Sequence, residues 1–306
     1  MNEKYIGRLI AASLFIAVIA GNWDVWWHGF IGRNIFWEPP HILLYSAVIV
    51  SILLGFYGWY KTKEKIWKRV ALALLLVLIA APFDELWHRI FGVESALNPI
   101  IVWSPPHLVL VGAIITTLLM LLSILKKDKN IFERQLFAAI IFASVISLAL
   151  FIVSPFQPIG PYNVIGFYGP FFITFVFIGF IFASEKIMKT FGSATLIALI
   201  LIAISAVSFG ETADMKGFAP PHDHPPSWVS VFSFLVPALI LDLTRKSPQW
   251  LRGSLAGLSF CLILYPLSNL FFTSGFQYST IETYIAIASG TLGGFASSIL
   301  LKKRVK

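Results

Sequence analysis

The chain has 306 residues, of which 58% are hydrophobic and only 12% are charged. Soluble globular domains carry roughly 25% charged residues, so this composition excludes an ordinary soluble protein and predicts an integral membrane protein. The formal net charge of +8 does not indicate a nucleic-acid partner, because the basic residues are spread over alternate connections between apolar segments.

Ten apolar segments follow one another, each close to the roughly 20 residues that cross a bilayer as a helix. We expect them near 6–27, 41–60, 67–88, 107–125, 134–153, 163–184, 190–210, 227–243, 249–271 and 281–301. Helices are the expected spanning form, because lipid offers no partner for free backbone groups. The sequence therefore predicts an all-α, polytopic transmembrane bundle of about ten spans. It forms one integral membrane domain, 1–306, built from repeated hairpins near 6–60, 67–125, 134–184, 190–243 and 249–301.

The distribution of basic residues predicts the orientation of these spans. All but three of the 23 Lys and Arg residues lie on one side if the N-terminus is cytoplasmic, and the exceptions are Arg33, Arg89 and Lys216. Cytoplasmic connections of membrane proteins are enriched in Lys and Arg. We therefore expect a multi-pass protein of the cell membrane with both termini in the cytoplasm.

All six histidines belong to three copies of one pattern at the outer ends of these segments. The first two copies share an acid, a histidine four residues later and a histidine after a Pro-Pro pair: Asp24, His28 and His41, then Asp84, His88 and His107. Residues four apart lie on one face of a helix, and proline suits the first turn of the next helix. Each hairpin can therefore present one carboxylate and two imidazoles to a metal ion on the outer side.

The third copy, within 211–224, has a different set of side chains. Its metal-ligand candidates are Glu211, Met215, His222 and His224. A thioether such as that of Met215 is a soft ligand that favours Cu(I). Four further acids are candidates for hydrogen-bonding to the metal-binding histidines and orienting them: Glu38, Glu94, Asp214 and Asp223.

Other interpretations of this pattern remain open. A lone Asp and His four residues apart is usually an ion pair, and a structural polar network or a proton relay would use the same residues. Ionisable residues at membrane depth are nevertheless costly and usually functional, and three copies face one side. Two histidines and a carboxylate with open positions suit iron or copper, and zinc uses the same donors. Metal binding is therefore the favoured hypothesis.

The spacing Asp24-x3-His28-x12-His41 resembles the copper-ligand pattern in the C subunit of particulate methane monooxygenase and ammonia monooxygenase. In that family an Asp, His, His set lies at helix ends near the outer membrane face, beside an Asn, His, His set that forms another copper position. The resemblance implies a first copper set at Asp24, His28 and His41. It implies a second at Asp84, His88 and His107, with aspartate in place of asparagine. The chain also resembles prokaryotic membrane proteins with Trp-His and Trp-Ser-Pro-Pro-His hairpins, which imply no particular activity.

These observations favour a copper-dependent oxygenase or related redox protein that acts on a small apolar substrate at the outer leaflet. The family resemblance implies that such an enzyme would be a metal-dependent monooxygenase. Three alternatives remain: a metal transport or handling protein, a zinc-dependent membrane hydrolase, and an accessory subunit of a membrane oxidase complex. The expected partners are the lipid bilayer and either other membrane subunits or further copies of the chain. No nucleic acid is expected, and the sequence assigns no catalytic residue.

Overall fold

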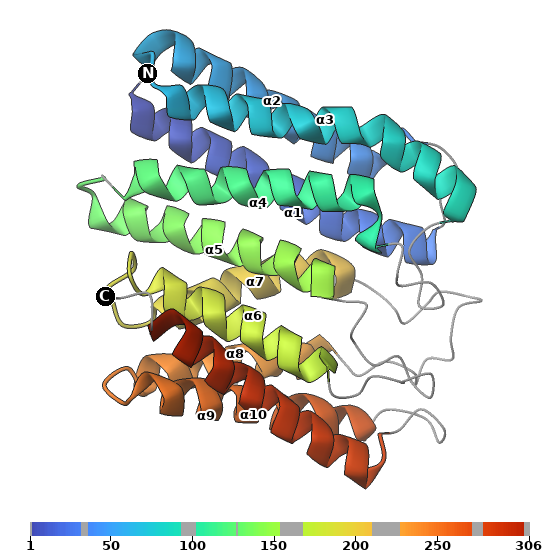
Figure 1. The fold of residues 1–306 in the computed structure, drawn as a ribbon, viewed down its shortest axis with the longest axis vertical. Coiled ribbons are helices and arrows are strands. Elements are labelled where there is room, and N and C mark those ends of the chain that lie inside the picture. Colours follow the sequence, from blue (N-terminus) through green and yellow to red (C-terminus); the bar gives the residue numbers. More distant parts are fainter. Residues whose placement is uncertain are drawn as a thin grey trace. The chain divides into compact units, whose positions relative to one another are not determined.

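The computed structural model describes residues 2–31, 36–92, 102–126, 128–153, 168–209, 227–270 and 278–302. Within these ranges the chain forms ten α-helices and no strand (Figure 1). Their bounds are α1 Glu3–Phe30, α2 Pro39–Thr62, α3 Lys65–Phe91, α4 Pro105–Leu125, α5 Ile131–Val153, α6 Tyr168–Ser184, α7 Ser193–Phe209, α8 Ser227–Leu243, α9 Gln249–Asn269 and α10 Thr280–Lys302. The prediction of an all-helical fold is confirmed for the part of the chain that is described.

Seven of these helices, α1 to α5 with α9 and α10, are long and apolar enough to cross a membrane. The other three, α6, α7 and α8, are apolar but have 17 residues each, at the short end of the range for a spanning helix. The helices are consistent with a multi-pass membrane protein, and a count of ten spans stays a prediction.

The Pro-Pro pairs fix the start of two helices, as their sequence context predicts. Pro39 is the first residue of α2 and Pro105 the first residue of α4, where the missing N–H costs nothing because the first N–H groups of a helix have no partner inside it. His41 and His107 therefore lie in the first turns of α2 and α4.

The helices group into two compact units. The first comprises Met1–Leu148 with Ile204–Ser208, and the second Ala149–Ala203 with Phe209–Lys306. The single integral membrane domain expected from the sequence stays a prediction.

In the first unit the two hairpins α1–α2 and α3–α4 form a ring of four helices. Helix α1 packs against α2 and α4, and α3 packs against the same two helices; Figure 1 shows them side by side in blue to green. Exchanging the hairpins, α1 for α3 and α2 for α4, leaves this set of neighbours unchanged. The helix contacts therefore match those of a four-helix bundle with an approximate two-fold axis along its centre. In this arrangement α1 and α3 are diagonally opposite.

Helix α3 has its polar groups inside and its large apolar groups outside. Six large apolar residues, spaced three or four apart along one face, are exposed: Leu72, Leu76, Ile79, Phe83, Leu86 and Ile90. Asp84 and His88 are buried on the other side of the same helix. A soluble helix shows the reverse pattern, whereas contact with lipid explains an apolar outer face.

Charged residues close the opposite end of the first unit, where α1 begins. Asp128, which is buried, accepts from Arg8 and from Lys4 Nζ at 3.4 Å. Burial raises the pKa of Asp128, but the hydrogen bonds from Arg8, from the Asn130 N–H and from Lys4 outweigh it and hold the pKa below its usual value. This network ties the start of α1 to the connection between α4 and α5.

In the second unit, glycines bring the backbones of α9 and α10 into contact. A Cβ on Gly257 would lie 2.2 Å from the carbonyl oxygen of Gly290, and one on Gly253 would lie 2.3 Å from that of Gly294. The Thr174 hydroxyl of α6 donates to the same Gly290 carbonyl at 2.8 Å. Small residues at crossing points and hydrogen bonds between helices are typical of helix packing in membranes.

Buried charges of the second unit also have partners. Asp242 accepts from the backbone N–H groups of Ala194 and Thr195 at 3.3 and 2.9 Å, which satisfies donors at the start of α7. Arg252 donates to Glu185 and, at 2.9 Å, to the Leu241 carbonyl. These hydrogen bonds of Asp242 and Arg252 compensate the burial of their charges and stabilise the second unit.

Candidate metal centre

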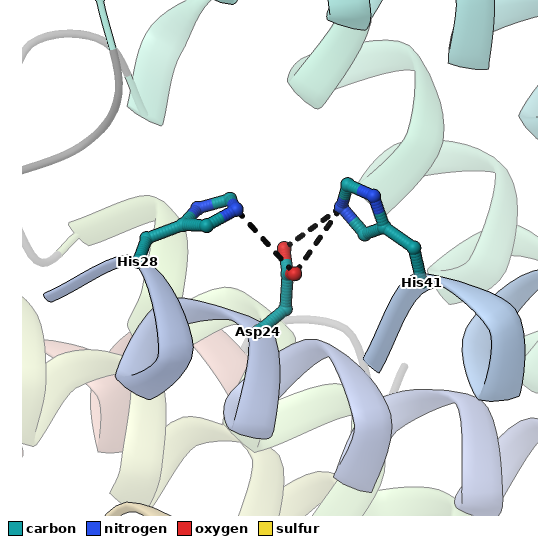
Figure 2. Close-up of side chains that lie close together, drawn as sticks. All are labelled: Asp24, His28 and His41. Atoms are coloured by element: carbon teal, nitrogen blue, oxygen red, sulfur yellow. Dashed lines mark hydrogen bonds and ion pairs between the residues drawn. The ribbon is translucent and has the colours of Figure 1, made fainter. Parts of the chain in front are cut away.

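The first hairpin brings an aspartate and two histidines together at the end of α1 and the start of α2. Figure 2 shows both imidazoles directed at the carboxylate of Asp24. Nε2 of His41 lies 3.2 Å from each carboxylate oxygen, and Nε2 of His28 lies 3.5 Å from Oδ1. One ligand atom from each of the three residues lies within 4.8 Å of the other two.

The second hairpin repeats this arrangement at the end of α3 and the start of α4. Nε2 of His107 lies 3.1 Å from Asp84 Oδ1, and Nε2 of His88 lies 3.5 Å from Asp84 Oδ2. The ligand atoms again lie within 4.8 Å of one another. We call the two groups the first triad (Asp24, His28, His41) and the second triad (Asp84, His88, His107).

Backbone carbonyls set the orientation of one imidazole in each triad. Nδ1 of His41 lies 2.7 Å from the carbonyl oxygen of Phe36, and Nδ1 of His88 lies 2.9 Å from that of Gly92. A carbonyl can only accept, so each Nδ1 carries the proton of the bond. In a neutral ring this leaves Nε2 with a lone pair, and in both rings Nε2 is the atom that faces the carboxylate.

A lone pair that faces a carboxylate oxygen at 3.2 to 3.5 Å requires a proton or a cation between the two atoms. A shared proton would make an imidazole–carboxyl hydrogen bond or an imidazolium–carboxylate pair, and a metal ion bound by both atoms would satisfy them equally well. Metal-bound histidines commonly donate their other N–H to a carbonyl or carboxylate, which is the arrangement of His41 and His88.

The distances fit a metal ion. Two ligand atoms on a tetrahedral ion with bonds of about 2.0–2.1 Å lie about 3.3–3.4 Å apart. The Nε2-to-oxygen distances in the two triads run from 3.1 to 3.5 Å. An ion could therefore be held by either triad with small movements of its side chains.

Burial separates these groups from ordinary surface charges. The side chains of the four histidines and of Asp84 are between 3% and 11% exposed, and the Asp24 side chain is 17% exposed. Charged groups are rarely buried to this extent unless they are paired or bind a metal. Each triad therefore groups buried donor atoms that suit a cation.

Glu38 is the one candidate orienting acid within the described residues. It is 4% exposed, and its Oε2 lies 3.8 Å from Nε2 of His28. Glu94, and the whole third copy with Glu211, Asp214, Met215, His222, Asp223 and His224, lie outside the described residues.

Sequence patterns did not predict the two carbonyls that orient His41 and His88. Phe36 carries no polar side chain, and its contribution comes from the backbone. Gly92 lies four residues after His88 and adopts φ +88°, a conformation that favours glycine, but a glycine at this spacing does not by itself indicate a contact between its carbonyl and the imidazole.

Comparison of the chain with known protein families, with proteins of described function and with solved structures finds no match. The two triads are therefore the basis for inferring the function of this protein.

Proposed function

We propose that this protein is an integral membrane metalloprotein whose metal centre is formed by the two triads. The observation that carries the proposal is the orientation of His41 and His88. Each ring donates through Nδ1 to a backbone carbonyl and turns Nε2 to a buried aspartate. One imidazolium could use the same orientation, but in each triad two Nε2 atoms converge on a single carboxylate, and one metal ion bound by all three groups accounts for both contacts.

Copper is the metal that we propose, with iron and zinc as alternatives. Four imidazoles dominate the donor set, and imidazole suits copper, zinc and iron. The spacing of the first triad also resembles the copper-ligand pattern of the membrane monooxygenases. A copper-dependent oxygenase or related redox protein follows as the proposed activity. Bound copper would supply redox chemistry, and the protein would hold it in place and exclude water.

We place the centre at the extracytoplasmic end of the first unit. Trp37 and Trp103, both exposed, flank the triads. At the other end Lys61 and Lys63 lie over Tyr60, and Lys68 lies over Trp59. Aromatic belts mark both membrane surfaces and excess lysine marks the cytoplasmic one. A substrate or electron donor would then reach the centre from the outer leaflet or the exterior.

Elemental analysis of the protein purified in mild detergent tests the proposal. We expect a stoichiometric transition metal in the wild type and its loss when Asp84→Asn is combined with Asp24→Asn. Glu85→Gln is the matched control, because Glu85 is the residue next to Asp84, is only partly buried, and pairs with the exposed Arg89 at 2.7 Å. Background metal in the wild type, or equal metal in all three proteins, would refute metal binding.

Zinc is the second candidate, because two histidines and a carboxylate with a free position are also the donors of catalytic zinc sites. Zinc-bound water would make the protein a hydrolase rather than a redox enzyme. Elemental analysis identifies the metal directly, and EPR spectroscopy after oxidation provides a second check, because Cu(II) gives a signal and Zn(II) gives none.

A further inference from the structure

The two triads are in contact with each other. The rings of His28 and His88 have their centroids 5.9 Å apart at an interplanar angle of 66°. His28 also lies 5.9 Å from His41, and His88 lies 5.1 Å from His107. The four imidazoles therefore form one unbroken row across the first unit.

The symmetry of the four-helix ring explains this contact. His28 on α1 and His88 on α3 occupy equivalent positions in the two hairpins, and α1 and α3 are diagonally opposite in the ring. Side chains that point toward a two-fold axis lie next to their symmetry equivalents, as His28 does next to His88. The two triads thus face each other across the centre of the bundle.

One position breaks this equivalence. The residue before the Pro-Pro pair, at the N-cap of the helix, is Glu38 in the first hairpin and Ser104 in the second. Ser104 caps its helix, since its hydroxyl accepts from the His107 N–H at 3.3 Å. Glu38 makes no side-chain cap bond to α2; its carboxylate is buried and its Oε2 lies 3.8 Å from His28 Nε2.

The position of Glu38 is compatible with binding to the same ion as His28. Two ligand atoms on one ion with bonds of about 2.0–2.1 Å can be at most about 4.1 Å apart, and 3.8 Å is below this limit. A carboxylate has two oxygens and can accept from both, so it can hold two ions at once. Asp24 and Asp84 already serve the separate triads.

We propose that the two triads form a single dinuclear metal centre in which Glu38 is a shared carboxylate ligand. The inference rests on the proposed metal binding and adds to it the number of ions, their coupling and a seventh ligand residue. Two-metal sites hold their ions about 3.5–4 Å apart around a bridging ligand. Such a centre suits a small oxygen-containing ligand bound between two ions, which neither triad could hold alone.

Copper loading followed by EPR spectroscopy tests this proposal on the full chain in detergent. In the wild type we expect two Cu(II) ions per chain that are magnetically coupled, seen as fewer EPR-visible spins than copper ions or as a half-field transition. His107→Ala, which breaks the second triad, should leave one copper with a full-intensity, uncoupled signal.

Glu38→Ser provides the sharper test because it gives the first hairpin the N-cap residue of the second. We expect the metal-free variant to unfold at the same or a higher temperature than the wild type, since serine is a better N-cap than glutamate. We expect its second copper to bind 10- to 100-fold more weakly, or its two ions to lose their coupling. Glu85→Gln, the control, should match the wild type in both measurements.

The outcomes separate this inference from the proposed function. Two bound coppers with a full, uncoupled spin count in the wild type would show independent sites and overturn the dinuclear centre while leaving the metalloprotein proposal intact. A Glu38→Ser protein with unchanged affinity and coupling would remove Glu38 as a ligand. A wild type that binds no stoichiometric copper would overturn both.

Discussion

Replacing Gly92 by alanine should weaken metal binding by changing the backbone conformation that holds the Gly92 carbonyl against His88. Gly92 ends α3 with φ +88° and ψ −177°, and its carbonyl accepts the Nδ1–H of His88. This region of backbone space is open essentially only to glycine. A Cβ at this position would meet nothing within 4 Å, so the substitution tests backbone conformation without a steric clash.

The cost follows from this geometry. Holding a non-glycine residue in this conformation costs on the order of 1–3 kcal/mol, and the chain escapes that cost by rotating the Gly92 carbonyl away from His88. Loss of a group that orients a metal-bound histidine typically reduces metal affinity 10- to 100-fold. We expect Gly92→Ala to lose affinity in this range when copper binding is measured by competition with a chelator.

Two other glycines provide controls for this prediction. Gly192 has φ +85° and equally open surroundings, but it lies in the second unit, so Gly192→Ala should lower thermal stability by a similar amount and leave metal binding unchanged. Gly112 lies inside α4 with no neighbour for a Cβ and no positive φ; Gly112→Ala should be neutral or slightly stabilising. Wild-type copper affinity in Gly92→Ala would refute the role of this carbonyl.

Asp128→Asn should lower the free energy of unfolding at pH 7 by about 1–3 kcal/mol, because Arg8 loses a charged acceptor. The pKa of Asp128 is lowered in the folded protein, so its contribution is present above the unfolded-state pKa of about 3.9. It is lost as the pH falls through the folded-state pKa, so unfolding curves of variant and wild type should converge in acid. Gly257→Ala should destabilise the second unit by about 1–3 kcal/mol or more, since its Cβ would lie 2.2 Å from the Gly290 carbonyl oxygen; calorimetry should show this loss with the metal content unchanged. A chelator should lower the melting temperature of the wild type, because a ligand at 100 times its Kd stabilises by about 2.7 kcal/mol; His28→Ala should respond less.

Local sequence signals were sufficient to predict the helices and the members of each triad. The apolar segments near 41–60 and 107–125 correspond to α2 and α4, and Pro39 and Pro105 set where these helices begin. A four-residue spacing is enough to put Asp24 and His28 on one face, because helix geometry alone decides it.

The relation between the two triads could not be predicted in the same way. The 5.9 Å contact of His28 with His88 depends on α1 and α3 lying diagonally in one ring, and a repeated motif does not say which helices are neighbours. The Glu38 side chain could either cap α2 or face the metal centre, and its position before the Pro-Pro pair is compatible with both. The carbonyls of Phe36 and Gly92 are invisible for a third reason, because every residue has one.

The inward placement of Asp84 and His88 on α3 has a consequence for biogenesis. The α1–α2 hairpin is synthesised before α3 and α4, so Asp24, His28 and His41 reach the membrane before the helices that pack beside them exist. Until α3 and α4 insert, the ionisable side chains of this hairpin raise the free energy of the partly assembled protein in lipid. We therefore expect the α1–α2 hairpin to insert stably only when α3 and α4 follow it, and a chain truncated after α2 to be degraded faster than the full chain.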